Sequence, residues 1–149
     1  MNQAKPRSPI ICLAPPLIAL ALILFPLGWL GEVWRPLGAV IDWLFPNAWA
    51  HAIGHASLFG LLGLLTLAAI PALRRRPRAY LGLLLLAGVG QEAFQALYKG
   101  QLLVFDDTRD IATDLIGGLA ALALIQAWAW FRRGKVAELF RRPRRQQDV

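Results

Sequence analysis

The stretch WAHAIGHASLFGLLGLLTLAAIPAL, residues Trp49–Leu73, contains no Asp, Glu, Lys or Arg and is long enough to cross a bilayer. A helix rises 1.5 Å per residue, so about 20 apolar residues span a hydrocarbon core of roughly 30 Å. Three further apolar runs have a comparable length: Pro9–Leu30, Ala79–Tyr98 and Asp110–Phe131. They are continuous and rich in leucine and alanine, unlike the alternating strands of a membrane barrel. The 149-residue chain is therefore expected to be one all-α domain, a four-helix transmembrane bundle.

Basic residues are distributed unevenly about the four runs. If the runs cross the membrane alternately, thirteen of the 16 lysines and arginines fall on one side: Lys5, Arg7, Arg74, Arg75, Arg76, Arg78, Arg132, Arg133, Lys135, Arg141, Arg142, Arg144 and Arg145. Because loops rich in Lys and Arg stay in the cytoplasm, both termini are predicted to be cytoplasmic. This topology accounts for the net charge of +7, so no nucleic-acid partner is expected. The basic tail, 132–149, is expected to lie against anionic lipid headgroups.

The first extracytoplasmic loop, Gly31–Ala48, is long and carries Trp34 and Trp43. Indole rings prefer the headgroup region, so a short interfacial helix is predicted around Leu37–Leu44. The apolar run before this loop ends at Trp29 rather than at a small-x-small cleavage site. It is therefore interpreted as a retained helix and not as a secretory signal.

Three of the predicted spans carry polar side chains in their outer third. These are His51 and His55 in the second span, Gln91, Glu92 and Gln95 in the third, and Asp110 and Asp114 in the fourth. Residues three or four positions apart share one face of a helix, so each group presents its side chains in one direction. A charge in hydrocarbon costs roughly 2.5–3.5 kcal/mol at mid-bilayer. This set of residues is therefore expected to be a functional site.

Two kinds of chemistry fit this set. Glu92, with His55 as its proton partner, is suited to general acid–base work. Alternatively, imidazole and carboxylate groups are ligands for a divalent metal. The metal candidates are His51, His55, Glu92, Asp110 and Asp114. The motif HAIGH lacks the glutamate of the HExxH protease motif, so its histidine spacing alone does not assign a metal.

Some of these residues also have simpler interpretations. Asp110 is suited to the N-terminal dipole of its own helix. His51 is suited to the wet membrane interface. Arg109 is placed either to pair with Asp106 or Asp107 at the surface, or to reach into the site as an anion clamp. These alternatives remain open from the sequence.

The order of the motifs resembles the VanZ-like family of small membrane proteins. HAIGHASLFG supplies His55 for the family's motif histidine, QEAFQ supplies Glu92 and Gln95, and DIATDLIG supplies Asp110 and Gly117. The resemblance covers the second, third and fourth predicted spans.

The chain departs from the family pattern at several positions. His51 and Ala52 stand where the family often has Asp-Lys, and Asp114 stands where it usually has Asn. The family arginine corresponds to Val104, and Arg109 is the nearest substitute but is out of register. If that arginine binds an anionic group in relatives, the resemblance does not carry this role to the present chain.

The family takes its name from a protein implicated in resistance to the glycopeptide antibiotic teicoplanin. The resemblance implies a multi-pass protein of the bacterial cytoplasmic (inner) membrane that works in the cell envelope. The leading hypothesis is an outward-facing site that binds, with or without chemical modification, a lipid-linked or amphiphilic envelope component. In that hypothesis Glu92 and His55 are catalytic, and the groups that contact the substrate are Gln95, Asp110, Asp114, Arg109 and His51.

Two other functions fit the same residues. One is a non-enzymatic scaffold or partner subunit of an envelope or polysaccharide assembly complex, either as a homo-oligomer or with an envelope protein. The other is an ion-linked transporter, because carboxylates and histidines inside a membrane mark such pathways. The cytoplasmic half of the predicted bundle lacks polar residues, so one copy offers no continuous path.

Overall fold

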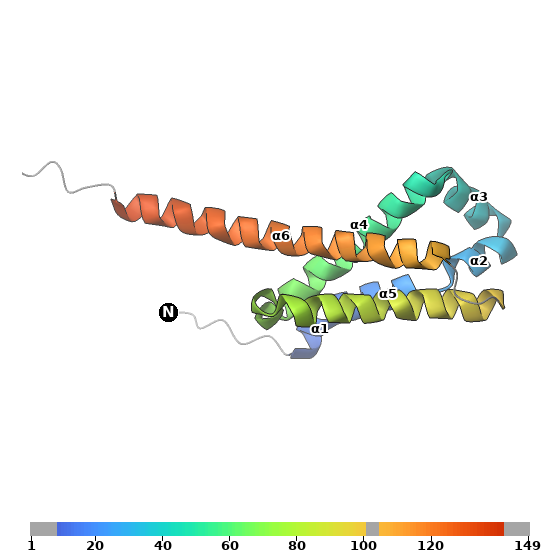
Figure 1. The fold of residues 1–149 in the computed structure, drawn as a ribbon, viewed down its shortest axis with the longest axis horizontal. Helices are drawn as coiled ribbons and strands as arrows, with labels where there is room; N and C mark the ends of the chain where they lie inside the picture. Colours follow the sequence, from blue (N-terminus) through green and yellow to red (C-terminus); the bar gives the residue numbers. More distant parts are fainter. Residues whose placement is uncertain (1–8, 101–104, 142–149) are drawn as a thin grey trace, which may run out of the picture.

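The computed structural model describes residues 9–100 and 105–141, and every regular element in these ranges is helical (Figure 1). The elements are α1 (Pro9–Leu24), α2 (Leu27–Val33), α3 (Arg35–Leu44), α4 (Ala48–Ala69), the short 3-10 helix η1 (Pro71–Arg75), α5 (Pro77–Lys99) and α6 (Phe105–Arg141). Three of these contain stretches long and apolar enough to cross a membrane, namely Ala48–Ala69, Pro77–Leu97 and Thr108–Gly134. The protein is therefore all-α, as predicted, with three helices of transmembrane length and composition.

The first predicted span, Pro9–Leu30, is divided in two. α1 ends at Leu24, and α2 begins at Leu27. Pro26 lies at the break, and proline both lacks an amide hydrogen and disfavours the helical conformation in the residue before it. α1 has 16 residues, or roughly 24 Å of helix, which is shorter than the hydrocarbon core. The prediction of one unbroken helix to Leu30 is wrong.

The other predicted spans coincide with α4, α5 and α6 but have different ends. The predicted stretch Trp49–Leu73 leaves the α-helix at Ala69 and continues as η1. α6 has 37 residues and extends beyond the predicted run Asp110–Phe131 at both ends. Hydropathy marks the apolar part of a helix, whereas the helix itself continues for as long as its backbone hydrogen bonds do.

A helical hairpin, α2 and α3, connects α1 to α4. The sequence predicts one short helix at Leu37–Leu44, and α3 begins two residues earlier, at Arg35. α2 was not predicted. The two short helices approach closely at Gly31 and Gly38. A Cβ on Gly38 would lie 2.6 Å from the carbonyl oxygen of Gly31, so this approach requires a glycine. α3 has no buried residue of its own, and its predicted place at the membrane interface stays a prediction.

The contact between α4 and α6 is the most extensive between two helices of the described chain. Figure 1 shows α4 crossing α6 obliquely, while α5 runs alongside α6. Small residues make the crossing close: a Cβ on Gly60 would lie 3.4 Å from the Gly117 carbonyl oxygen, and a Cβ on Gly117 would collide with the backbone of Ala56. Close backbone approach through small residues is the usual basis of helix association in membranes, where lipid is as apolar as a leucine side chain.

An apolar core fills the space between α1, α4, α5 and α6. Its buried members are Ile23, Phe59, Leu62, Leu67, Leu73, Tyr80, Leu84 and Leu122. The hydroxyl of Tyr80 donates a hydrogen bond of 2.8 Å to the Gly118 carbonyl oxygen, and Gly63 leaves room for that hydroxyl. This bond connects the first turn of α5 to the middle of α6.

Replacement of Tyr80 by phenylalanine is expected to lower the free energy of unfolding by about 0.6 kcal/mol, the average measured for hydrogen bonds between helices in a membrane, and by no more than about 1.7 kcal/mol, the largest value measured. The ring still fills the core, but the Gly118 carbonyl oxygen loses its donor. Thermal unfolding in detergent measures the loss. A variant as stable as the wild type would show that this carbonyl is satisfied in another way.

The exterior of the bundle is apolar. Leu86 is 71% exposed, Leu97 81% and Trp130 76%, and many other large apolar side chains on α4, α5 and α6 are also exposed. Soluble monomers do not expose apolar surface on this scale. These helices therefore fit a lipid environment, and the polar groups described below are the exception within it.

Candidate functional site

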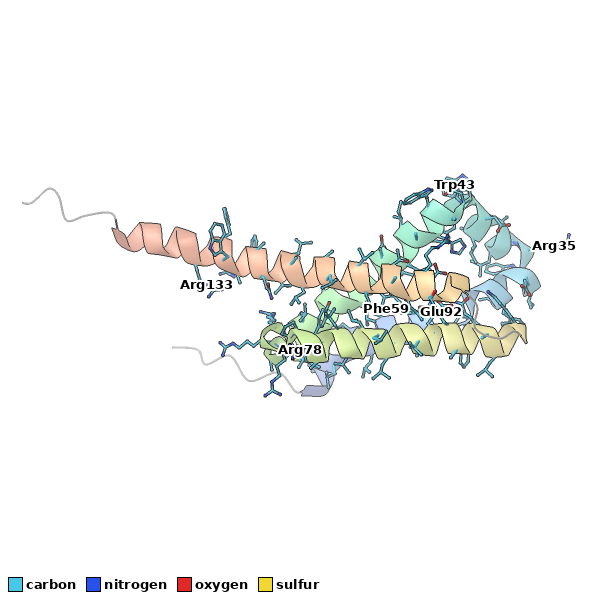
Figure 2. The ribbon with its side chains drawn as sticks, viewed as in Figure 1. Arg35, Trp43, Phe59, Arg78, Glu92 and Arg133 are labelled. Carbon is cyan, nitrogen blue, oxygen red and sulfur yellow. The ribbon has the colours of Figure 1, made fainter. Side chains whose placement is uncertain are left out.

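Three helices bring polar side chains together at one end of the bundle. His55 lies in the third turn of α4, Glu92 in the third turn from the end of α5, and Asp110 and Asp114 in the first three turns of α6. At 1.5 Å per residue, His55, Glu92 and Asp114 lie roughly 8–11 Å inside the ends of their apolar stretches. Figure 2 shows Glu92 beneath the first part of α6, with Phe59 beside it toward the middle of the bundle.

The imidazole of His55 is held between two aspartates of α6. Its Nδ1 lies 3.0 Å from Oδ1 of Asp114, within hydrogen-bond distance. Its Nε2 lies 3.9 Å from Oδ2 of Asp110. An ionised carboxylate can only accept, so Nδ1 donates to Asp114, and in the neutral ring Nε2 then carries a lone pair. The ring is thereby oriented with Nε2 toward Asp110.

His55, Glu92 and Asp110 converge on one point. Each offers one nitrogen or oxygen atom, and these three atoms all lie within 4.8 Å of one another. The four residues His55, Glu92, Asp110 and Asp114 are called the polar cluster below.

The polar cluster is largely shielded from solvent. Asp114 is 1% exposed and Glu92 3%, and these are the buried charged side chains of the described chain. Among the described residues, no hydrogen-bond partner reaches Oδ2 of Asp114 or Oδ1 of Asp110, although both atoms are buried. Buried polar atoms normally have a partner, so these atoms are suited to binding something from outside the chain.

Two neighbours shape the pocket of Asp114. A Cβ on Gly88 of α5 would lie 3.0 Å from Oδ2 of Asp114 and 3.8 Å from the ring of Phe59. Gly88 therefore leaves space for the carboxylate, and Phe59 closes the side toward the apolar core. Gly88 is not among the site residues predicted from the sequence. The available signal was its position one helical turn before Glu92, on the same face of α5.

The remaining predicted site residues lie at the margin of the polar cluster or outside it. His51 is exposed, and its ring centroid lies 5.4 Å from that of Phe45 and 6.3 Å from that of His55. Gln95 is half-buried and accepts a 3.4 Å hydrogen bond from Lys99. Arg109 is exposed. His51 therefore borders the site through its ring contact with His55, and the hydrogen bond of Gln95 is with Lys99, outside the polar cluster.

Several sequence interpretations concern residues that the structure leaves undescribed. Val104, the position of the family arginine, lies outside the described residues. The same holds for the side chains of Asp106 and Asp107, with which Arg109 is predicted to pair. The sequence pairs His55 with Glu92, whereas the hydrogen bond of His55 in the structure is to Asp114.

An apolar groove lies between α4 and α6. It has a volume of about 430 Å³ and is lined by apolar and small residues such as Ile53, Ser57, Leu61, Ile116 and Ala120. His55 and Asp114 do not line it. The groove faces outward and is therefore a place for lipid chains rather than part of the polar cluster.

Comparisons with known proteins do not add to this geometry. No protein-family model matches the chain, and neither a curated protein nor a solved structure is found that is similar to it. The resemblance to the VanZ-like family therefore stays a prediction, and the function is argued from the polar cluster.

Proposed function

We propose that the protein is a multi-pass protein of the bacterial cytoplasmic membrane whose polar cluster binds an amphiphilic or lipid-linked envelope component and acts on its headgroup. The observation that carries this proposal is the convergence of His55, Glu92 and Asp110 within 4.8 Å inside an otherwise apolar bundle. Intramembrane ionisable residues are costly and mark functional sites.

The proposed topology has four crossings, α1, α4, α5 and α6, with both termini in the cytoplasm. Figure 2 supports it, because Arg78 and Arg133 lie toward one end of the bundle and Glu92 toward the other. Since arginine-rich ends stay in the cytoplasm, the polar cluster then faces outward. The broken first helix reaches across with the help of the residues around Pro26.

The location of the polar cluster favours an amphiphilic ligand. The cluster lies within a few turns of the helix ends, where a lipid headgroup meets the apolar chains. The exposed leucines of α4 and α5 provide a surface for those chains. In this proposal Glu92 accepts or returns a proton, and His55, oriented by Asp114, contacts the same headgroup. This assignment agrees with the envelope function that the VanZ-like resemblance implies.

A scaffold is the second candidate function, and one observation favours it. The His55–Asp114 hydrogen bond joins α4 to α6, the helices that already pack most closely. A polar pair at such a contact can serve packing alone, with a second copy or an envelope protein as partner. The transporter alternative has less support, because the buried charged residues of the described chain, Glu92 and Asp114, both lie at one end.

Retention of lipid by the purified protein tests the proposal. The full chain is extracted from bacterial membranes in mild detergent, and its bound lipids are identified by native mass spectrometry. The wild type is expected to retain one class of lipid, and Glu92→Gln about tenfold less of it, which corresponds to about 1.4 kcal/mol of binding free energy. Asp42→Asn is the matched control, since Asp42 is an exposed carboxylate on α3 outside the polar cluster.

The same spectra distinguish the two functions. Equal lipid retention by the wild type, Glu92→Gln and Asp42→Asn would contradict the proposed site. A protein that carries no selected lipid but appears as a dimer, or with a stoichiometric protein partner, would support the scaffold instead.

A further inference from the structure

We propose that the polar cluster is a binding site for one divalent cation, held by Nε2 of His55 and one carboxylate oxygen each of Glu92 and Asp110. Asp114 is not a ligand in this site but orients His55 from behind. The role of the cation rests on the proposed function, whereas the evidence for its site is the arrangement of these four side chains.

The first argument is geometric. Three atoms that lie within 4.8 Å of one another can each lie within roughly 2.8 Å of a common point, so small side-chain rotations bring them to the 2.0–2.2 Å of bonds from zinc to nitrogen or oxygen. The ligands come from three different helices, each anchored by the packing of the bundle. Three protein ligands leave one position of a tetrahedral site open, as in catalytic rather than structural metal sites.

The second argument is the orientation of the imidazole. Histidine ligands usually donate their other ring N–H to a carboxylate, which sets the tautomer and the ring direction. His55 has this arrangement, with Nδ1 at 3.0 Å from Asp114 and Nε2 facing Asp110 at 3.9 Å. A histidine that served packing alone would need only the first of these contacts.

The third argument is charge. Glu92, Asp110 and Asp114 bring three carboxylates to one place, beside the imidazole of His55. Arg109, the arginine next to Asp110 in the sequence, is exposed, and the ion pairs of Asp110 and Asp114 within the described residues are with His55. Charges in a low-dielectric site must be paired or coordinate a metal. A divalent cation would bring positive charge to these carboxylates, and the buried Oδ1 of Asp110 has no hydrogen-bond partner among the described residues.

The donor set indicates the class of metal and of ligand. One imidazole and two carboxylates suit zinc or manganese better than a metal that prefers thiolates, or calcium with its six to eight oxygens. With the cation in place, the open position can take an oxygen of a phosphate or carboxylate headgroup. Without it, the three carboxylates would repel any such anion. The inference therefore narrows the proposed ligand to a lipid with an anionic headgroup.

Metal content of the full-length protein tests the inference. The protein, free of any polyhistidine tag, is purified in detergent, stripped with chelator and exposed separately to Zn²⁺ and Mn²⁺, and the bound metal is measured after gel filtration. The wild type is expected to hold one ion per chain. Asp114→Asn is expected to bind the metal roughly 10–100-fold more weakly, as for other groups that hydrogen-bond to a metal ligand. A larger loss of metal affinity is expected when a ligand itself is replaced, in His55→Ala, Glu92→Gln and Asp110→Asn. Binding of Co²⁺ gives a visible spectrum that reports the coordination geometry of the ion, and this spectrum should be lost in His55→Ala.

Asp42→Asn is the control and should bind like the wild type, and the helix content of each variant confirms that it is folded. The inference is wrong if neither metal binds near one per chain, or if Glu92→Gln and Asp110→Asn, which preserve side-chain shape, bind as well as the wild type.

Lipid retention with and without chelator separates this inference from the proposed function. Loss of the lipid on chelation supports both. A lipid that stays bound after chelation contradicts the metal site and leaves the proposed function standing. Stoichiometric metal with no selected lipid supports the metal site and contradicts the proposed function.

Discussion

Replacement of Gly117 by valine is expected to prevent formation of the folded bundle. A Cβ at this position would collide with the carbonyl group and Cα of Ala56, which are backbone atoms and cannot rotate away. α4 and α6 would have to separate along their most extensive contact. Overpacking typically costs 1–3 kcal/mol where side chains can adjust, and the cost here is expected to exceed about 3 kcal/mol because backbone must move.

The measurement is the yield and thermal midpoint of the purified protein in detergent. Gly134→Val in the same helix is the matched control, since nothing lies within 4 Å of a Cβ at Gly134. The free energy of unfolding of the control should lie within about 0.5 kcal/mol of the wild type, as is usual for exposed positions. The different helix propensities of glycine and valine add a small further change. If both variants fold equally well, the close crossing of α4 and α6 is not the packing that stabilises this protein.

Replacement of Asp114 by alanine is expected to lower the free energy of unfolding by about 3 kcal/mol and to remove lipid retention together. The side chain is 1% exposed and accepts the 3.0 Å hydrogen bond from Nδ1 of His55. Its removal leaves a buried imidazole without the acceptor that orients it. Breaking a buried pair by deleting one partner is costly for this reason, typically 3–5 kcal/mol.

Asp114→Asn separates orientation from charge. Asparagine keeps an oxygen at the position that accepts from His55 but removes one negative charge from beside Asp110. It is therefore expected to retain most of the stability that alanine loses, while its binding of metal is weakened. Thermal unfolding and lipid retention are measured on both variants, with Asp42→Ala as an exposed control. If alanine and asparagine have the same effect on stability, the orienting hydrogen bond is not what makes Asp114 important.

Both predictions concern one helix contact. Gly117 and Asp114 lie three residues apart on α6, so close packing and the polar cluster depend on the same rotation of that helix about its axis. Gly117 allows α4 to approach, and this approach brings His55 to within hydrogen-bond distance of Asp114. A variant that opens the crossing should therefore lose the site even if the chain remains helical.

The apolar runs by themselves determined α4, α5 and α6, since a backbone in hydrocarbon must satisfy its hydrogen bonds internally and a helix is the local way to do so. The same logic led to the error at the first span, where hydropathy continues to Leu30 but Pro26 interrupts the backbone hydrogen bonds. The unpredicted helix α2 follows from that break. Hydropathy also could not predict where the helices end, because α6 continues beyond its apolar run at both ends.

Helical spacing also indicated which residues share a face, and so His55, Glu92, Asp110 and Asp114 could be proposed as one group. Only the tertiary structure decided that His55 donates its hydrogen bond to Asp114, that His51 is exposed beside His55, and that Gly88 makes room for the carboxylate. Spacing within a helix follows from its 3.6-residue repeat, which is local. The rotation and crossing of one helix against another depend on packing between residues far apart in the sequence, such as Ala56 and Gly117, and no local repeat encodes it.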